Sequence, residues 1–413
     1  MKNKITGLCI IALCAATASC GYMAIGKRDN VHEARPSSSS GKAAEYNSAV
    51  IIGTVSCPRD RAVLVMAWST ARDGEGPVEQ VFLNRPGSFM LYVPEGRFRV
   101  YAMTDADEDG FFTDDEVCAM GGGEGGITVR AGDVASGLEL IGTGQRMKLP
   151  RKISIRDDGS IPRQGPNGEI MKLYDERFCQ KNASAGWWKP TLFMKAFGAN
   201  IYLTGPYDAK KIPVLFVHGA EGSPQNWAYF HFRLDGERYQ PWYFYYPSGI
   251  RLSLASRLLY ESLLDLRRKY GFSKICITAH SMGGLIGRYL LCYHDLKRHG
   301  IEVKLFATLA SPWSGFESAD LALRLPSKKL PSWIDVSTHS GFIRRALEGH
   351  LPTAVSHHLF YGKGDTVSKG RALDERVYAE AKGKHAFDVD HDTILSDRAV
   401  FIRYNEILSR EMR

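Results

Sequence analysis

The segment 274–291 constrains the fold of this chain more than any other. Residues 275–278, Ile-Cys-Ile-Thr, form an apolar run that predicts a buried β-strand. The run leads directly into Ala279-His-Ser281-Met-Gly283, and an apolar helical pattern follows at once. A serine between small residues at a sharp strand-to-helix turn is typical of a nucleophile elbow, where the helix N-terminus directs backbone N–H groups toward the reacting oxygen. We therefore predict that Ser281 is a nucleophile rather than a structural serine.

The surrounding sequence predicts an α/β domain over residues 200–413. From residue 211 onward, strand-like runs, Gly-rich turns and helical patterns alternate, which predicts a mostly parallel sheet with helices on both faces. Residues 211–217 and 304–309 are expected strands, and 397–410 is an expected amphipathic helix. The whole chain has 413 residues, which is long for one ordinary domain and indicates a second one.

An anion-stabilising loop is expected after the strand 211–217. The sequence there is His218-Gly219-Ala220, and an H-G pair after an aliphatic strand favours backbone donors for an oxyanion. We expect the N–H groups of Ala220 and Met282 to form this oxyanion hole. His218, and His280 beside the nucleophile, are interpreted as residues that brace the site.

The remaining catalytic groups are sought in the order serine, acid, histidine. A short apolar strand from residue 358 ends in a Gly-rich loop that carries Asp365, our candidate for the acid; the alternative is an ordinary turn residue. Two histidines follow. His391 leads directly into the last helix and is preferred over His385, six residues earlier. The acid would hold the imidazole tautomer and stabilise the imidazolium.

Taken together, these motifs resemble those of α/β-hydrolase lipases and esterases, including the bacterial triacylglycerol lipase and GPI inositol-deacylase-like groups. The resemblance covers about residues 200–413 and rests on P-V-L-F-V-H-G (213–219), Y-P-S-G (246–249), A-H-S-M-G-G (279–284) and H-D-T-I-L (391–395). It implies a triad of Ser281, Asp365 and His391, with Ala220 and Met282 as the hole. The chain departs from the commonest elbow by carrying Ala279 where glycine is usual.

The chemistry implied is hydrolysis of acyl or lipid esters through an acyl-enzyme, with no cofactor required. Two alternatives remain open: an acyltransferase that uses the same triad, and a surface-binding protein with a vestigial hydrolase fold. The complete set of candidate groups argues against the second. Residues 313–350 could form a lid. The aromatic run 242–246 could line an acyl pocket, although a buried strand is the preferred interpretation.

The N-terminus predicts a bacterial lipoprotein. Lys2 and Lys4 precede an apolar run, 5–18, that is too short to span a bilayer comfortably and is typical of a signal peptide. The run ends in Thr-Ala-Ser-Cys20, which resembles a lipobox although Thr17 stands where an aliphatic residue is usual. Lipidation of Cys20 would anchor the chain to the cell envelope without a spanning helix, by default at the outer membrane. The alternative is an ordinary signal peptide cut nearby.

Residues 21–46 include a Pro-Ser-Ser-Ser-Ser-Gly run that predicts a flexible tether. Residues 47–147 contain short strand-like runs separated by Gly, Pro and charged turns, which predict a small β-sandwich of about seven strands. The run 87–102 resembles the carboxypeptidase-regulatory-like and prealbumin-like accessory sandwiches. Residues 148–199 are interpreted as a connecting segment.

An acidic stretch inside the expected sandwich has the spacing of an EF-hand calcium loop. Aspartates occupy its first, third and fifth positions, glycine its sixth and glutamate its twelfth. The candidate Ca²⁺ ligands are Asp105, Asp107, Asp109, Phe111 and Glu116. The flanking sequences predict strands rather than helices, so an acidic hairpin turn is the competing interpretation.

Net charge and cysteine content say less about the function and the disulfide pairing of this chain. The net charge of +8 is scattered in short clusters, and no nucleic-acid-binding motif is present. Five cysteines follow Cys20, namely Cys57, Cys118, Cys179, Cys276 and Cys292, so at least one is expected to be a free thiol. Cys57 and Cys118 share the predicted sandwich, where an oxidising compartment would permit a bridge. The sequence leaves their pairing, the oligomeric state and the substrate chain length open.

Overall fold

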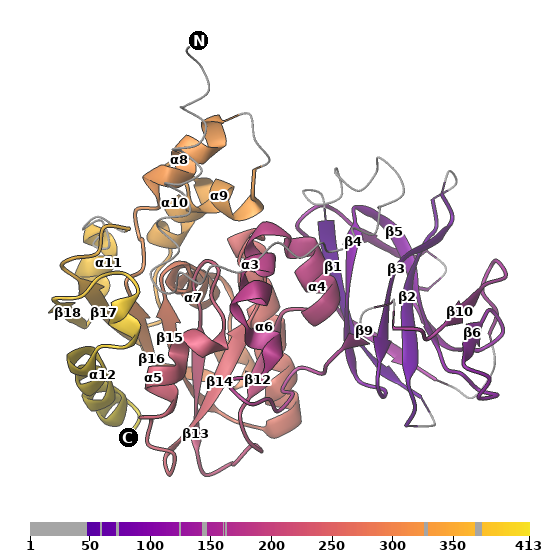
Figure 1. Ribbon diagram of the computed structural model, residues 1–413, viewed down its shortest axis with the longest axis horizontal. Helices are drawn as coiled ribbons and strands as arrows, with labels where there is room; N and C mark the ends of the chain where they lie inside the picture. The colour runs from indigo at the N-terminus through magenta and orange to yellow at the C-terminus, as the bar shows by residue number, and fades with distance from the viewer. Residues whose placement is uncertain are drawn as a thin grey trace, which may run out of the picture.

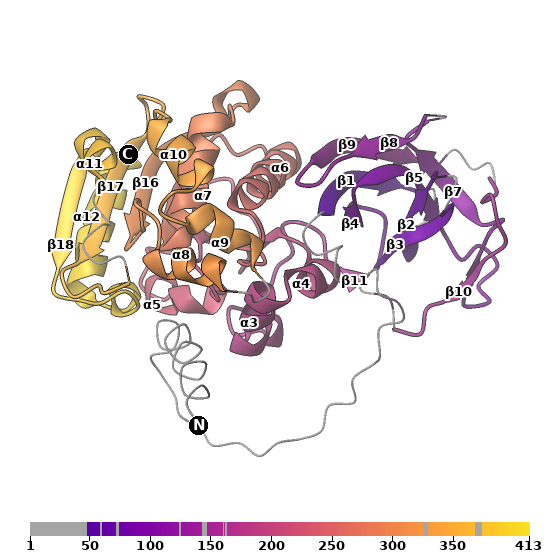
Figure 2. The ribbon, with the colours of Figure 1, turned by 90° about the horizontal axis from the view of Figure 1, so that it is seen from above.

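The computed structural model describes residues 48–413 apart from 58–59, 72–73, 124, 143–146, 160, 162, 326–328 and 368–373. The expected signal peptide, the lipidation site Cys20 and the tether lie outside these residues. Figures 1 and 2 show two bodies side by side, an N-terminal β-structure and a C-terminal α/β domain.

The N-terminal body consists of two facing sheets. Its strands are β1 (Ser48–Ser56), β2 (Val63–Ser69), β3 (Gly76–Leu83), β4 (Ser88–Pro94), β5 (Gly96–Met103), β6 (Phe111–Thr113), β7 (Val117–Gly121), β8 (Ile127–Val129) and β9 (Val134–Ile141). One sheet has the order β4-β1-β9. The other runs β11-β3-β2-β5-β7, where β11 is Arg163–Gln164, and β8 pairs with β5; β6 belongs to neither sheet. The buried side chains between the sheets come from alternate strand positions, as in Ala49, Ile51, Val65 and Ala67. This arrangement confirms the predicted all-β domain.

The sandwich extends into the segment that was expected to be a connection. Strand β10 (Ser154–Arg156) pairs with β6, and β11 (Arg163–Gln164) pairs with β3. Two helices follow, α3 (Gln180–Trp188) and α4 (Pro190–Phe197). Neither helix was anticipated, because the sequence 180–197 has no clear amphipathic stripe at its start.

Polar contacts join the two bodies. Lys195 on α4 lies 2.7 Å from Glu79 on β3. On the long helix α6 (Leu252–Tyr270), Glu261 accepts a hydrogen bond from Ser136 at 2.9 Å. The contacts hold the sandwich against α4 and α6.

The C-terminal domain contains one seven-stranded sheet in the order β12-β14-β13-β15-β16-β17-β18. Its strands are β12 (Asn200–Leu203), β13 (Ile212–Val217), β14 (Tyr239–Tyr245), β15 (Lys274–His280), β16 (Glu302–Leu309), β17 (Ser356–Gly362) and β18 (Gly383–Phe387). β12 is antiparallel to β14, and the other pairs are parallel. The strands predicted from apolar runs are therefore present, and the predicted mostly parallel α/β sheet is confirmed.

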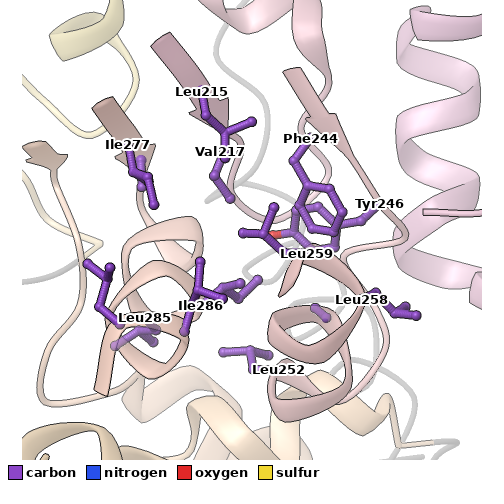
Figure 3. Close-up of a cluster of buried hydrophobic side chains, with 14 of the residues drawn as sticks. Leu215, Val217, Phe244, Tyr246, Leu252, Leu258, Leu259, Ile277, Leu285 and Ile286 are labelled. Atoms are coloured by element: carbon purple, nitrogen blue, oxygen red, sulfur yellow. The ribbon is translucent and has the colours of Figure 1, made fainter. Parts of the chain in front are cut away.

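Helices cover both faces of this sheet. The α-helices of the C-terminal domain that follow α4 are α5 (Ala228–His231), α6, α7 (Met282–Tyr293), α8 (Glu317–Arg324), α9 (Pro331–Val336), α10 (Gly341–Glu348), α11 (Glu375–Glu380) and α12 (Arg398–Glu411). One face packs against α6 and α7, and the other packs against α5 and α12. Figure 3 shows Val217 and Ile277 of the sheet meeting Leu259 of α6 and Ile286 of α7. These side chains are fully buried, as near-continuous apolar strands of a parallel sheet require.

No helix in the described part of the chain combines the length and the apolar character that a bilayer crossing demands.

Candidate active site

Ser281 lies at the turn between β15 and α7. Its backbone has φ 51° and ψ −128°, outside the regions that a residue with a side chain normally adopts. The Ser281 N–H donates to the Leu309 carbonyl at 2.8 Å, which ties the turn to the neighbouring strand β16. The residue is 3% exposed. The sequence therefore forms the strained strand-to-helix turn that the pattern predicted.

Two glycines permit this turn to approach β13 closely. A Cβ at Gly283 would lie 2.5 Å from the Val217 carbonyl oxygen, and a Cβ at Gly219 would lie 2.8 Å from the Cβ of Ser281. Both distances are below ordinary contact, so a side chain at either position would displace the backbone. The small residues of the two motifs serve close packing around the serine.

A tight turn after β18 presents His391. The Oδ1 of Asp390 accepts from the Thr393 N–H at 2.8 Å and from the Thr393 hydroxyl at 2.7 Å. The Asp390 N–H in turn donates to the Thr393 Oγ1 at 3.0 Å. The hydrogen bond from the Thr393 backbone lowers the pKa of Asp390. This local network fixes the loop on both sides of His391.

The three candidate triad residues form one chain of contacts. His391 Nε2 lies 2.8 Å from Ser281 Oγ, and His391 Nδ1 lies 3.0 Å from Asp365 Oδ2. Asp365 Oδ1 accepts a further hydrogen bond from the Val367 N–H at 2.9 Å. Because the carboxylate can only accept, Nδ1 carries the proton and Nε2 is left to accept from the serine hydroxyl. Asp365 and His391 are 5% and 8% exposed, so little water competes for these contacts.

The expected oxyanion donors lie on two different elements that meet at Ser281. Met282 is the first residue of α7 and is fully buried, whereas Ala220 is exposed on the loop after β13. The next residue, Glu221, has φ 50°, and its N–H donates to Ser248 Oγ at 3.0 Å. Ser248 belongs to the Y-P-S-G motif after β14. That motif therefore holds the oxyanion loop in place.

His218 braces the same loop. Its Nδ1 donates to the Gly219 carbonyl at 2.8 Å, and its ring stacks on Tyr246 at 4.4 Å between centroids. The Tyr246 hydroxyl donates to the His218 carbonyl at 2.9 Å. Burial lowers the pKa of His218 to about 4, so the ring is neutral at pH 7. These contacts agree with the bracing role interpreted from sequence.

His280 connects the turn at Ser281 to the loop that carries His391. Its Nε2 lies 2.8 Å from the His391 main-chain oxygen, and because that oxygen only accepts, Nε2 carries the proton. Burial, reinforced by the nearby His391, lowers the pKa of His280 to about 3. The sequence placed His280 near the nucleophile but gave no sign of which group it would contact.

The competing histidine, His385, lies elsewhere. It sits on β18, and its Nε2 is 3.1 Å from Nδ1 of His358 on the adjacent β17. Its other nitrogen faces Arg403 on α12. The aromatic run 242–246 is also accounted for: residues 242–245 form the end of strand β14, which lies next to the edge strand β12, and Tyr246 follows directly. All five residues are buried.

The segment 313–350, for which a lid was one possibility, contains α8, α9 and α10. Figure 1 shows these helices grouped at one end of the domain beside α3. Asp335 of α9 anchors this segment. This carboxylate is 1% exposed, accepts from the Leu252 N–H at the start of α6 at 2.6 Å, and lies 2.7 Å from the Arg251 guanidinium. The N-cap residue of α6, Arg251, makes no capping hydrogen bond with its own side chain. Asp335 of α9 therefore caps the N-terminus of α6.

An aromatic cluster borders the oxyanion loop. The Trp188 ring lies 6.0 Å from Trp333 of α9 and 6.4 Å from Trp187, in both cases edge to face. Ser184 of the same helix α3 donates to the Glu221 carboxylate at 3.3 Å. Burial raises the pKa of Glu221, against hydrogen bonds from Trp188 and Ser184. Sequence reasoning missed this association because α3 precedes the domain's first strand.

The acidic stretch forms the loop between β5 and β7. One carboxylate oxygen from each of Asp105, Asp107 and Asp109 lies within 4.8 Å of the others. Glu116 is turned inward, where it accepts from the Ala106 N–H at 2.6 Å and from the Thr113 N–H at 2.9 Å. Three of the five candidate ligands thus converge through their side chains. Phe111 is the first residue of β6, and its N–H donates to Asp109 at 2.8 Å.

Comparisons with known proteins match part of the C-terminal domain. Residues 208–349 match the model of the family described as "Putative serine esterase (DUF676)". No curated protein matches the chain significantly.

Several solved structures resemble the C-terminal half. A gene product from Listeria innocua is 16% identical, with 48% of this chain and 94% of that chain covered and a TM-score of 0.38. The lipase BlEst2 from Bacillus licheniformis is 17% identical, with coverage of 50% and 97% and a TM-score of 0.39. Est1E from Butyrivibrio proteoclasticus is 14% identical, with coverage of 52% and 96% and a TM-score of 0.39.

Proposed function

We propose that the C-terminal domain is an α/β-hydrolase of the serine esterase or lipase type, which cleaves carboxylic esters through an acyl-enzyme on Ser281. The match of residues 208–349 to the serine esterase family model supports this proposal. The contact chain from Ser281 through His391 to Asp365, at 2.8 and 3.0 Å, is the observation that carries this proposal. A neutral serine is a weak nucleophile and requires an adjacent base held in the correct tautomer. The buried carboxylate of Asp365 supplies that orientation.

In the first half-reaction, His391 Nε2 removes the hydroxyl proton as Ser281 Oγ attacks the ester carbonyl carbon. The resulting oxyanion is stabilised by the N–H groups of Ala220 and Met282, the second of which lies at the N-terminus of α7. Collapse of the tetrahedral intermediate releases the alcohol, which takes its proton from His391.

In the second half-reaction, His391 removes a proton from water, and the resulting nucleophile attacks the acyl-enzyme carbonyl. The acid is released and the proton returns to Ser281. In both half-reactions Asp365 holds the imidazole of His391 in the required tautomer.

The substrate that fits best carries an apolar acyl chain. The cluster of Trp187, Trp188 and Trp333 lies beside the oxyanion loop, and Trp188 is 45% exposed. An exposed indole ring beside the loop that carries Ala220 and Glu221 favours an apolar acyl group over a small polar one.

The decisive test is turnover of p-nitrophenyl esters of increasing acyl length by the full chain in detergent. Wild type should turn over, and Ser281→Ala should lose activity by at least about 10³-fold. A fluorophosphonate probe should label wild type and not the variant. Ser154→Ala, on the exposed strand β10, is the matched control and should behave as wild type.

Absence of both turnover and labelling in folded wild type would reject the proposal and leave the sandwich as the place to seek a function. If wild type is active, adding primary alcohols distinguishes the two uses of the triad: a new ester product indicates acyl transfer, and free acid alone indicates hydrolysis.

We also propose that Cys20 is lipidated and holds the protein in the cell envelope. The support is the sequence alone: a basic start, an apolar run, small residues before the cysteine and a tether-like composition after it. Metabolic labelling with an alkyne fatty acid should mark wild type and not Cys20→Ala. Labelling retained in the variant would place the lipid elsewhere, and no labelling in wild type would reject the anchor.

A further inference from the structure

Two cysteines meet at the edge of the sandwich, far from the catalytic serine in sequence and in fold. Cys57 directly follows β1 of the three-stranded sheet, and Cys118 belongs to β7, the edge strand of the facing sheet. Their sulfurs lie 2.7 Å apart although the residues are separated by 61 positions. Both side chains are half-buried and pack against the core between the sheets.

A β-bulge directs Cys118 toward its partner. In the pairing of β5 with β7, Ala102 faces Ala119 whereas Met103 faces Val117, so Cys118 is the extra residue. An extra residue re-aims the side chain that it carries. Val117 packs on the outer face of the sheet, while Cys118 and Ala119 both contact the core between the sheets. Without the bulge, strict alternation would have directed Cys118 away from the side that Ala119 occupies.

The other cysteines in the described part of the chain have no such partner. Cys276 is fully buried in β15, and burial raises the pKa of its thiol to about 12. Burial likewise raises the pKa of the Cys292 thiol to about 11. Cys179 precedes α3 and is half-buried. They provide internal controls for reactivity.

From this arrangement we propose that Cys57 and Cys118 are joined by a disulfide that fastens the two sheets of the sandwich together. A disulfide brings its sulfurs to about 2.05 Å and accepts a range of side-chain rotations, so a small rotation about Cα–Cβ completes the bond. The proposal is independent of the assigned esterase chemistry.

The oxidant is a small-molecule or protein disulfide. The thiolate of one cysteine attacks a sulfur of that disulfide, which forms a mixed disulfide and releases one thiol of the oxidant. The second cysteine then attacks the protein sulfur of the mixed disulfide and releases the other thiol. Two protein thiols are oxidised, and one external disulfide is reduced to two thiols.

Cys57 is the thiol suited to attack first. The hydrogen bond from Cys118 lowers the pKa of Cys57, while the same interaction raises the pKa of Cys118. A thiol with a lowered pKa supplies more of the reactive thiolate at neutral pH.

The bond would stabilise the acidic loop 105–116 as well as the sheets. Arg61, four residues after Cys57, lies 2.5 Å from Glu108 and donates to the Asp105 carbonyl at 3.5 Å. Cys118 follows the same loop on its other side. Fastening Cys57 to Cys118 therefore restrains both chain segments that hold the loop, and it closes a long loop of the unfolded chain.

The test is peptide mapping of the full chain under non-reducing conditions, after equilibration with reduced and oxidised glutathione. We expect a linked pair of peptides that contain Cys57 and Cys118, which reduction separates, while Cys179 remains alkylatable. The proposal would be overturned if, at the highest ratio of oxidised to reduced glutathione, both cysteines are recovered in separate, alkylated peptides. The protein in that sample must still unfold cooperatively. Because this measurement uses the wild-type protein alone, its result does not depend on whether a variant folds.

A second measurement uses variants. Cys57→Ser with Cys118→Ser should lower the unfolding temperature by about 10 °C or more relative to oxidised wild type. Reduction should bring wild type to the same value and leave the double variant unchanged. Cys179→Ser is the matched control and should retain the oxidation-dependent shift. An unfolding temperature that does not respond to oxidation in wild type would also contradict the proposal.

Discussion

His280 donates a hydrogen bond from its Nε2 to the main-chain oxygen of His391, at 2.8 Å. The two residues are separated by 111 positions, and their rings lie 4.9 Å apart. The residue before the nucleophile thereby positions the backbone of the proposed general base. His391 is thus held from three sides: by Asp365 at Nδ1, by Ser281 at Nε2 and by His280 at its carbonyl.

Replacing His280 by Ala should lower kcat by about 10- to 100-fold, because the His391 carbonyl loses its donor and the imidazole is no longer held at one position. His280→Gln, whose amide can donate, should recover part of the loss. The acidic limb of the pH profile of kcat/KM should also move in His280→Ala. His299→Ala, an exposed histidine, is the control. Unchanged kcat in a folded His280→Ala protein would show that the contact does not position His391.

Replacing Asp365 by Asn should reduce kcat by roughly 10⁴-fold while leaving the fold intact. An amide can donate to His391 Nδ1, which favours the tautomer that cannot accept the serine proton. Steady-state kinetics on the best p-nitrophenyl ester give the value, and circular dichroism verifies folding. A reduction below tenfold would assign the role of the acid to another residue.

Replacing Asp335 by Ala should release the segment 316–349. The substitution leaves the Leu252 N–H and the Arg251 guanidinium without their acceptor, at a cost of about 1–3 kcal/mol. Limited proteolysis should cut between α8 and α10 faster than in wild type, and KM for long-chain esters should change more than KM for acetate esters. Glu348→Ala, at the exposed end of α10, should leave both measurements unchanged.

The native state should lose stability as the pH falls from about 6.5 to about 4. Burial lowers the pKa of His218 to about 4 and of His280 to about 3, whereas an unfolded histidine titrates near ~6.5. Between the native and the unfolded pKa, each of these histidines is protonated in the unfolded chain but neutral in the native chain. Its contribution to the free energy of unfolding is therefore present above the unfolded pKa and is lost as the pH falls toward the native pKa.

The loss at its limit approaches roughly 3 kcal/mol for His218 and roughly 5 kcal/mol for His280. Urea unfolding at pH 7.5 and pH 4.5 measures the difference. His280→Gln should reduce the slope between these pH values, and His299→Gln should not. A midpoint that is constant over this range would contradict the neutral assignment of the buried rings.

Calcium binding by the loop 105–116 remains a prediction. The clustered aspartate oxygens are the hard donors that Ca²⁺ prefers, but the buried Glu116 carboxylate is already satisfied by backbone N–H groups. Binding through the aspartates alone should be weak, with Kd on the order of 10⁻⁴–10⁻³ M. Added Ca²⁺ should raise the unfolding temperature of wild type, and a chelator should reverse the shift.

Asp107→Asn should abolish the response to Ca²⁺, and Asp60→Asn, an exposed acid before β2, should retain it. If Ca²⁺ has no effect on wild type at millimolar concentration, the loop is an acidic turn.

Local pattern was sufficient for much of the C-terminal domain. Apolar runs indicated β13, β15, β16 and β17, because strands buried on both faces of a parallel sheet consist almost entirely of apolar residues. The sequence around Ser281 indicated the elbow, because small residues and a strand-to-helix change leave a mark within a few positions. Chain order then selected Asp365 and His391 as candidates for the positions beside Ser281.

Contacts between residues that are distant in sequence could be identified only from the tertiary structure. Asp335 caps α6 from another segment, and the Ser184 and Trp188 side chains reach the oxyanion loop from a helix that precedes the domain's first strand. Neither association leaves a periodic signal, because each depends on one side chain meeting a backbone group far away along the chain.

By itself, therefore, the sequence determined which segments form the buried strands, where the nucleophile turn lies and which groups could complete a triad. The tertiary structure decided that His391 rather than His385 meets Ser281, that His280 supports His391, and that a bulge brings Cys118 to Cys57. The physical reason is that strand periodicity and turn chemistry are local, whereas contact distances follow from how the layers pack.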